Sequence, residues 1–189
     1  RADCALIVAD EPAVSAGCFT QNVVAAAPVL FSKSAVEAKD VARAVLINAG
    51  QANAATGAKG MEDTLESARA VAEALGLDDP NDVLIESTGV IGKRIKMPEL
   101  ISAVPRLAEN LAADPAAAAA AATAICTTDL ARKSVAVSVP LPDGRVVKIG
   151  GMGKGSGMIH PNMATMLGVL TCDAPVSVEA WRAMTKRAC

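Results

Sequence analysis

The feature that most constrains this fold is a strand, a loop, an amphipathic helix and a second strand in succession. Residues 44–48 form an apolar run that leads into small polar residues over 48–60. Helical spacing then places five apolar side chains on one face of a helix that Gly76 ends. They are Met61, Leu65, Ala68, Ala72 and Leu75. A second apolar run follows at 83–85, and this order of elements predicts an α/β fold.

Local patterns predict the remaining elements. Short apolar runs predict strands at residues 5–8, 17–20, 29–31 and 166–170. Valines that alternate with other residues before Asp143-Gly144 predict a β-hairpin. Helices are predicted over 98–107, where Pro105 would disturb the middle, and in the alanine tract 116–122 behind the cap Asp114. A last helix is predicted from about residue 177, and no linker divides the chain.

Composition excludes several classes of function. The net charge is −2 and aromatic residues make up only 2% of the chain, which argues against nucleic-acid binding. No apolar run is long enough to span a bilayer. Five cysteines at irregular spacings, with no CxxC pair, predict reduced thiols and no disulfide framework. His160 is the only histidine, which excludes a histidine-rich metal site.

The densest group of small polar residues is the glycine-rich segment 150–165. It is no phosphate-binding loop of the Walker type, because Lys154 is followed by Gly155. Its glycines let backbone amides crowd around a ligand, and Lys154 offers a positive charge to a carboxylate. Thr165 could act as a nucleophile if its own α-amine, freed by cleavage of the preceding bond, removed its proton. From the residues alone, the favoured interpretation of Thr165 is an ordinary β-branched residue entering the strand at 166–170.

Three other segments have a similar composition and also follow apolar runs or helices: 48–57, 87–92 and 126–129. Sites form on loops of this kind when a rigid α/β scaffold holds them. Within the first segment, we expect Asn48, Asn53 and Thr56 to shape the loop through bonds to the backbone.

Residues 154–168, KGSGMIHPNMATMLG, resemble the signature of the ornithine acetyltransferase family, the glutamate N-acetyltransferases of arginine biosynthesis. Segments 19–29, 48–57, 87–92, 127–129 and 150–173 also resemble that family and occur in its order. The amino-acid sequences of several segments, such as 46–57 and 134–137, are most similar to those of the plant and algal members, which are chloroplast proteins. The resemblance therefore implies a mixed-sheet, layered α/β fold of the N-terminal-nucleophile kind, incomplete in this chain. It implies a chloroplast location, with the cytoplasm as the alternative for a bacterial source.

The resemblance also implies a precursor that cuts itself at the Ala164–Thr165 bond. Residues 1–164 would correspond to the α chain and residues 165–189 to the start of the β chain. The chain opens on Arg1 and stops at Cys189 within a predicted helix, so we expect the N-terminal part of a longer precursor.

Individual roles follow from the same resemblance. Thr165 matches the family's nucleophile, which also contacts substrate, and Thr88 and Gly89 match the pair that forms the oxyanion hole. Thr128 and Lys154 match substrate-binding residues, with Thr127 as the alternative to Thr128. His160 is expected to have a structural or orienting role, since the amine already provides the base.

The implied reaction moves an acetyl group from N-acetylornithine to glutamate through an acetyl-threonine intermediate. No metal and no cofactor are expected, and acetyl-CoA is a candidate co-substrate. The expected partner is the protein's own β chain, in an αβ heterodimer that joins a larger oligomer, with no nucleic acid and no membrane. Two alternatives remain: an aminopeptidase or amidohydrolase with an N-terminal nucleophile, and a non-catalytic α/β domain that binds a small molecule.

Overall fold

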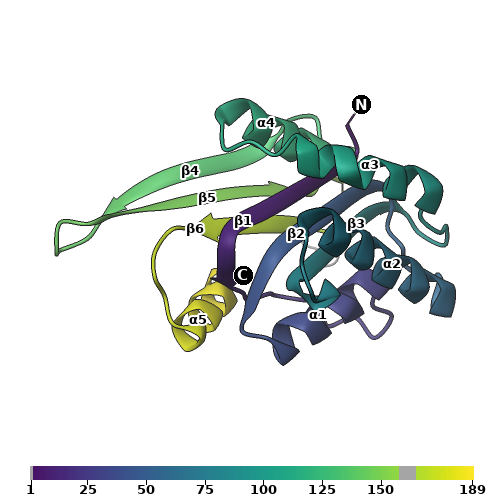
Figure 1. Cartoon of the computed structure of the whole chain (residues 1–189), viewed down its shortest axis with the longest axis horizontal. Coiled ribbons are helices and arrows are strands. Elements are labelled where there is room, and N and C mark those ends of the chain that lie inside the picture. Colours follow the sequence, from purple (N-terminus) through teal and green to yellow (C-terminus); the bar gives the residue numbers. More distant parts are fainter. Residues whose placement is uncertain (1, 158–164) are drawn as a thin grey trace.

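The computed structural model describes residues 2–157 and 165–189, which form two three-stranded sheets (Figure 1). The first sheet has the order β1 (Cys4–Val14), β2 (Val41–Gln51) and β3 (Val83–Val90). β1 is antiparallel to β2, and β2 is parallel to β3. The second sheet is antiparallel throughout, with the order β4 (Lys133–Pro140), β5 (Val146–Lys154) and β6 (Leu167–Cys172).

Three helices pack on one face of the first sheet: α1 (Ala27–Ala38), α2 (Gly57–Leu75) and α3 (Met97–Glu109). Leu6, Leu46 and Ile85 point from the three strands toward these helices, because they lie opposite one another in register. Phe31, Val71 and Val104 fill the space from the helix side. A short 3-10 helix, η1 (Pro80–Asp82), leads into β3.

The opposite face of the first sheet packs against the second sheet and the end of α4 (Pro115–Ala124). Ala5 and Ile47, on that face, join a cluster with Ile125, just after α4. Met152, Leu167 and Val169 cover this cluster from β5 and β6. The first sheet is therefore buried on both faces, between helices and the second sheet.

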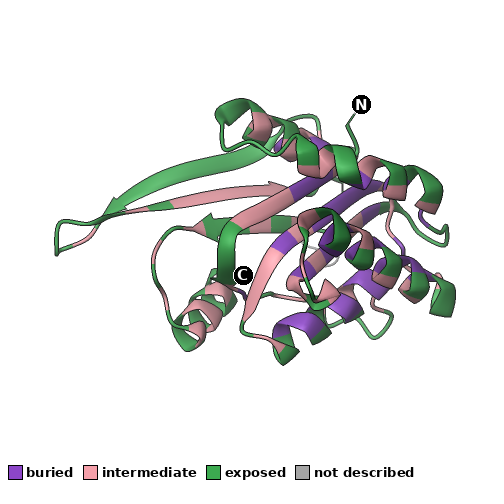
Figure 2. Ribbon diagram, in the orientation of Figure 1, coloured by how far each residue is buried: buried purple, intermediate pink, exposed green. Residues whose placement is uncertain are grey.

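The outer face of the second sheet is apolar and uncovered. Val135, Val137 and Val139 alternate along β4 and are 39–62% exposed, and Leu170 on β6 is 54% exposed. Register places Val135 beside Gly151, and a Cβ on Gly151 would lie 2.6 Å from a Leu170 methyl, so these side chains share one face. Figure 2 shows β4 exposed and β5 mostly of intermediate exposure, in contrast to the buried centre of β2.

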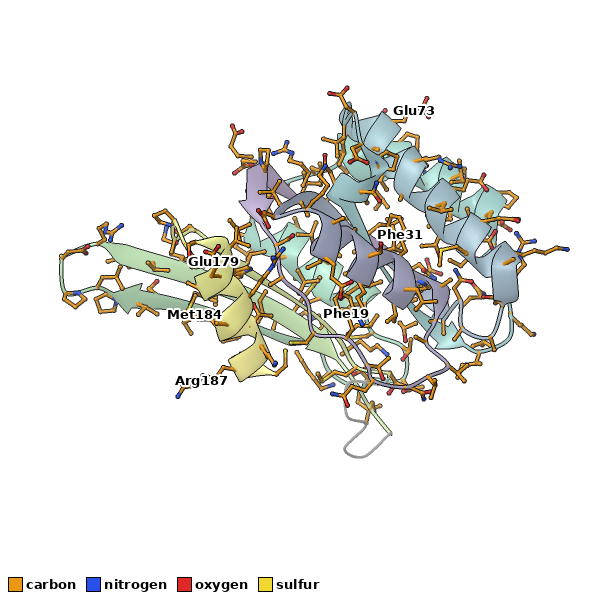
Figure 3. All side chains as sticks on the ribbon, turned by 90° about the horizontal axis from the view of Figure 1, so that it is seen from below. Phe19, Phe31, Glu73, Glu179, Met184 and Arg187 are labelled. Atoms are coloured by element: carbon orange, nitrogen blue, oxygen red, sulfur yellow. The ribbon has the colours of Figure 1, made fainter. Side chains whose placement is uncertain are left out.

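The last helix, α5 (Val178–Ala188), is attached mainly by polar contacts and has no buried residue. The Arg182 guanidinium donates to the Val36 carbonyl at 2.9 Å and pairs with Asp40 at 3.2 Å. Figure 3 shows Arg187 of α5 extending away from the body of the chain, whereas Phe31 lies on α1.

Local chemistry explains most of the boundaries. Gly76 ends α2 in the left-handed conformation, with φ of 65°, and the Asp114 carboxylate accepts from the Ala117 amide at 2.8 Å at the start of α4. The Ser177 hydroxyl caps α5 in the same way. The structure confirms the predicted helix ending at Gly76, the alanine helix, the hairpin at Asp143-Gly144 and the last helix.

Two predicted strands are wrong. Residues 29–31 lie in α1, where Pro28 occupies the first turn and Phe31, Ala35 and Val36 are buried at helical spacing. Residues 17–20 have no regular structure. Pro105 does not end α3 either, since that helix continues to Glu109.

Candidate functional site

The carboxyl ends of β2 and β3 lie side by side because these strands are parallel. Asn48 is in register with Ser87, and Gly50 with Gly89, so part of each predicted polar segment belongs to a strand. Beyond the strands, the Ala52 amide donates to the Val90 carbonyl at 3.0 Å. The first two polar segments are thus joined along one edge of the first sheet.

Gly89 lies against the backbone of Gly50. A Cβ on Gly89 would come within 2.3 Å of the carbonyl carbon and oxygen of Gly50, and the φ of Gly89 is +128°. Both facts require glycine, since L-residues avoid this conformation and the backbone opposite cannot retreat. The residue predicted to donate its amide to an oxyanion is therefore fixed by tight packing of two strands.

The loop after β2 is organised by a buried asparagine. Asn53 is fully buried, and its amide group donates to the Gly60 carbonyl at 2.8 Å and to the Thr64 hydroxyl at 2.9 Å. The Thr56 hydroxyl donates to the Asn53 side-chain oxygen at 2.7 Å. These bonds are those of a loop-shaping residue, as predicted for Asn53 and Thr56; Asn48 similarly bonds the Gln51 carbonyl.

Lys154 joins three strands from the two sheets. It ends β5, is only 5% exposed, and its ammonium donates to the Thr88 hydroxyl of β3 at 2.6 Å. The same ammonium donates to the carbonyl of Thr165, which precedes β6. The structure thus brings together Thr88, Lys154 and Thr165, and it excludes a solvated surface position for Lys154.

The charges around Lys154 come from two elements. Burial lowers the pKa of Lys154, and Asp129, Glu86 and Cys126 act in the opposite direction. Glu86 lies on β3 and is half-buried, with its Oε2 atom fully buried; this burial raises its pKa to about 7, although the charge of Lys154 opposes the rise. Sequence reasoning missed Glu86; its signal is an acidic residue directly after the apolar run 83–85.

Asp129 connects the loop after α4 to the end of β5. Its Oδ1 accepts from the Gly155 amide at 3.0 Å and also from the Lys133 ammonium. Burial by itself raises the pKa of Asp129, but bonds from Lys133, Gly155 and the Thr127 amide outweigh it and lower the pKa to about 2. Asp129 therefore stays ionised and holds the third segment next to Lys154. It is the second residue for which sequence reasoning assigned no role.

The two candidate threonines of the third segment differ in exposure. Thr128 is exposed and Thr127 is half-buried, in the loop that Asp129 anchors. Both lie within two residues of Asp129, so they are at the same end of the molecule as Lys154.

Thr165 is exposed and has a φ of +69°, a left-handed conformation that is rare for a β-branched residue. Ala164 and His160 lie outside the described residues. Within residues 2–157 and 165–189, no group of His, Cys, Asp and Glu side chains is arranged to hold a metal ion. None of the helices in those ranges has the length and apolar character needed to cross a membrane.

The fold and this cluster match one protein family. The model of the ArgJ family matches residues 1–189, and the chain belongs to that family. It is 58% identical over its whole length to the chloroplastic arginine biosynthesis bifunctional protein ArgJ of Ostreococcus lucimarinus, covering 40% of that protein. It is 60% identical over 97% of its length to the ArgJ protein of Physcomitrium patens, also named chloroplastic, covering 35%. The chain is of this plant and algal chloroplast type, and it spans about two fifths of the length of these relatives.

Two solved structures have the same fold. The arginine biosynthesis bifunctional protein from Bacillus halodurans is 35% identical, with a TM-score of 0.78 over 86% of this chain and 83% of that one. The ornithine acetyltransferase from Mycobacterium tuberculosis, solved with ornithine, is 38% identical, with a TM-score of 0.76 over 86% and 84%. These neighbours confirm the layered, mixed-sheet α/β fold implied by the resemblance.

Proposed function

We propose that this chain is part of an acetyltransferase of arginine biosynthesis that moves acetyl from N-acetylornithine to glutamate. The observation that carries the proposal is the buried Lys154 ammonium, bonded at 2.6 Å to Thr88 and also to the carbonyl of Thr165. Three of the positions that match the family's site residues thereby meet, although they are separated by up to 77 positions in the sequence. The relatives named ArgJ and ornithine acetyltransferase support the same reaction.

In the proposed reaction the Thr165 hydroxyl oxygen attacks the acetyl carbonyl carbon of N-acetylornithine. Its proton passes to its own α-amine, which cleavage of the 164–165 bond has freed, and then to the departing amine of ornithine. The acetyl group is left as an ester on Thr165. The α-amine of glutamate attacks this ester, and Thr165 recovers its proton as N-acetylglutamate leaves.

Thr88 is suited to stabilise the oxyanion of both steps. Its hydroxyl oxygen accepts from Lys154, so its hydroxyl hydrogen is available for another acceptor. Together with the amide of Gly89, it would supply two donors, each worth roughly 3 kcal/mol to the transition state. Lys154 keeps its proposed role as a substrate-binding residue, and Thr128, or Thr127 in its place, completes the substrate contacts. The reaction needs no metal and no cofactor, and acetyl-CoA is a second candidate acetyl donor.

The outer face of the second sheet supports the proposed partner. Its exposed valines and Leu170 form an apolar surface, and the relatives are much longer than this chain. We assign this surface to the remainder of the family protein, with residues 1–164 in the α chain and 165–189 opening the β chain. An αβ pair that joins a larger oligomer in the chloroplast is the proposed form.

The surface can be tested with two neighbouring residues of β4. Val137 belongs to the apolar outer face, whereas Ser138 points to the other side of the sheet and is also exposed. In a protein with the full length of its relatives, Val137→Asp should weaken the association of the α and β chains. Ser138→Asp should leave it unchanged, and equal behaviour of the two variants would contradict the assignment.

The activity is tested by intact-mass analysis of the full-length protein, before and after incubation with N-acetylornithine. We expect cleavage before Thr165 and the gain of one acetyl group on the fragment that begins there. Thr165→Ala should remove both events, and Thr171→Ala, an exposed threonine on β6, should remove neither. Release of the acetyl group to water, with none passed to glutamate, would favour a hydrolase. A single unmodified chain would favour a non-catalytic domain.

A further inference from the structure

Glu86 is the acidic side chain closest in sequence to Thr88 and lies on the same face of β3. Side chains alternate along a strand, so residues 86 and 88 both point toward the second sheet. Across the parallel pairing Glu86 is in register with Ile47, which is fully buried between the two sheets. Glu86 is half-buried next to this apolar layer, where an uncharged side chain would pack at lower cost.

One oxygen of the Glu86 carboxylate has no hydrogen-bond partner among the described residues. This oxygen, Oε2, is buried. The other carboxylate near Lys154, that of Asp129, also has a buried oxygen without a hydrogen bond, Oδ2, but its Oδ1 accepts from Lys133 and from the Gly155 amide. Glu86 is thus the acidic group near Lys154 for which the structure gives no other partner.

The charged and titratable groups that act on Lys154 are Glu86 from β3 and Asp129 and Cys126 from the loop after α4. Lys154 alone acts on Glu86 through charge. A buried ammonium stays charged only if nearby negative charge offsets its lost hydration. A neutral amine could still donate to Thr88 and to Thr165, but an ammonium forms stronger, charge-assisted bonds, so the charge strengthens both contacts.

We propose that Glu86 is a positioning residue, whose carboxylate keeps Lys154 charged and thereby holds the Thr88 hydroxyl in the orientation that serves the oxyanion. This inference rests on the proposed acetyl transfer for its catalytic consequence. The pairing of Glu86 with Lys154 does not depend on it. Protonation of Glu86 weakens the hold on Lys154, so the pair responds to pH near neutrality.

The pairing is tested by unfolding the full-length protein in urea as wild type, Glu86→Gln, Lys154→Met and the double variant, at pH 8. Removing Lys154 alone leaves a buried, unpaired carboxylate, so Lys154→Met should be clearly destabilising. Adding Glu86→Gln should restore part of the loss, and this non-additivity is the expected result. Additive changes would overturn the pairing. Glu86→Gln alone should fold at least as cooperatively as the wild type.

The catalytic consequence is tested by the pH dependence of kcat/KM for acetyl transfer. The ratio of kcat/KM of the wild type to that of Glu86→Gln should be near 1 at pH 5.5. At that pH Glu86 of the wild type is protonated, and it is therefore uncharged, like glutamine. The ratio should rise to about 10-fold at pH 8.5, less than the roughly 100-fold or greater loss expected when an oxyanion donor is removed outright. Because both proteins share the Thr165 amine, its titration cancels from the ratio. Glu86→Asp should recover part of the rate, and Glu73→Gln, an exposed residue of α2, should match the wild type at every pH.

A ratio that is the same at all pH values would overturn the positioning role, since a packing defect has no reason to follow the ionisation of Glu86. Absence of acetyl transfer in the wild type would overturn the proposed function instead. The unfolding cycle would still decide whether Glu86 and Lys154 are paired.

Discussion

The central strand of the first sheet and the edge strand of the second are both rich in apolar residues, yet they differ completely in exposure. Leu46 and Ile47 of β2 are at most 1% exposed, whereas every residue of β4 is exposed. Helices cover one face of the first sheet and the second sheet covers the other. The second sheet is covered on its inner face along β5 and β6 only. The difference indicates that this chain covers both faces of the first sheet and leaves an apolar face of the second sheet open.

The largest effect is expected where the first sheet is tightest. Gly89→Ala would force a methyl group to within 2.3 Å of the Gly50 backbone at a positive φ, so we expect a loss of about 4 kcal/mol or more. The control is Gly155→Ala beside the second sheet, where the added methyl would meet only Met166 at 3.8 Å. Urea unfolding should place this control within about 1 kcal/mol of the wild type. Similar midpoints for the two variants would disprove the difference in packing.

The next effect compares one apolar residue from each sheet. Leu46→Ala removes a side chain that is 1% exposed and should lower the free energy of unfolding by about 3 kcal/mol. Val137→Ala, at 45% exposure, should cost less than about 1 kcal/mol in this chain. In the full-length protein the cost of Val137→Ala should increase if a further layer covers it. An unchanged cost there would mean that the outer face stays open.

A smaller, pH-dependent effect is expected at Asp129, which connects the loop after α4 to the end of β5. Its pKa is lowered to about 2, so its stabilising contribution is present above its unfolded pKa of about 4. That contribution is lost as the pH falls through 2. Asp129→Asn should therefore cost up to about 2 kcal/mol at pH 7 and close to nothing at pH 2. Lys133→Gln removes one donor and should move the loss to higher pH; an unmoved transition would contradict the role of that contact.

The smallest changes in the free energy of unfolding are expected at exposed ion pairs, and they should be equal beside the first sheet and beside the second. Lys33 and Glu37 form an exposed pair at 4.0 Å on α1, and Arg145 and Asp143 form another at 2.7 Å beside the β4–β5 turn. Lys33→Gln and Asp143→Asn should each change the free energy of unfolding by about 0.5 kcal/mol or less. Thermal unfolding at low and high salt would check this. A large change in only one region would mean that its surface charges, and not only its apolar faces, distinguish it.

Local signals predicted most of the fold. The periodicity before Gly76 and the alternating valines before Asp143-Gly144 are properties of a few neighbouring residues, and both predictions are confirmed. Residues 29–31 were assigned to a strand because three apolar residues do not distinguish strand from helix. The helical signal lay in the wider spacing of Phe31, Ala35 and Val36 behind Pro28.

Local sequence patterns predicted less of the candidate site than of the fold. Lys154 and Thr165 were singled out by the composition of segment 150–165, and Thr88 only through a resemblance to a family. No local pattern predicts that Lys154 bonds Thr88 across 66 positions. Ser87 to Val90 were taken as a loop because they are small and polar, but pairing with β2 extends the strand through them. Glu86 and Asp129 acquire their properties from burial and from distant partners, which only the folded chain supplies.

The close approach of Gly89 to Gly50 also limits what can be learned from comparing sequences. A methyl group at residue 89 is excluded on steric grounds alone. A related protein that had lost acetyl transfer but kept this sheet would therefore retain the glycine, and its presence would be a marker of ancestry and not of activity. Thr88 is held instead by the hydrogen bond from Lys154 to its hydroxyl, so a change at residue 88 would report on the site itself. Active and inactive members of the family should therefore be distinguished by the residues at positions 88 and 154, and not by the glycine at position 89.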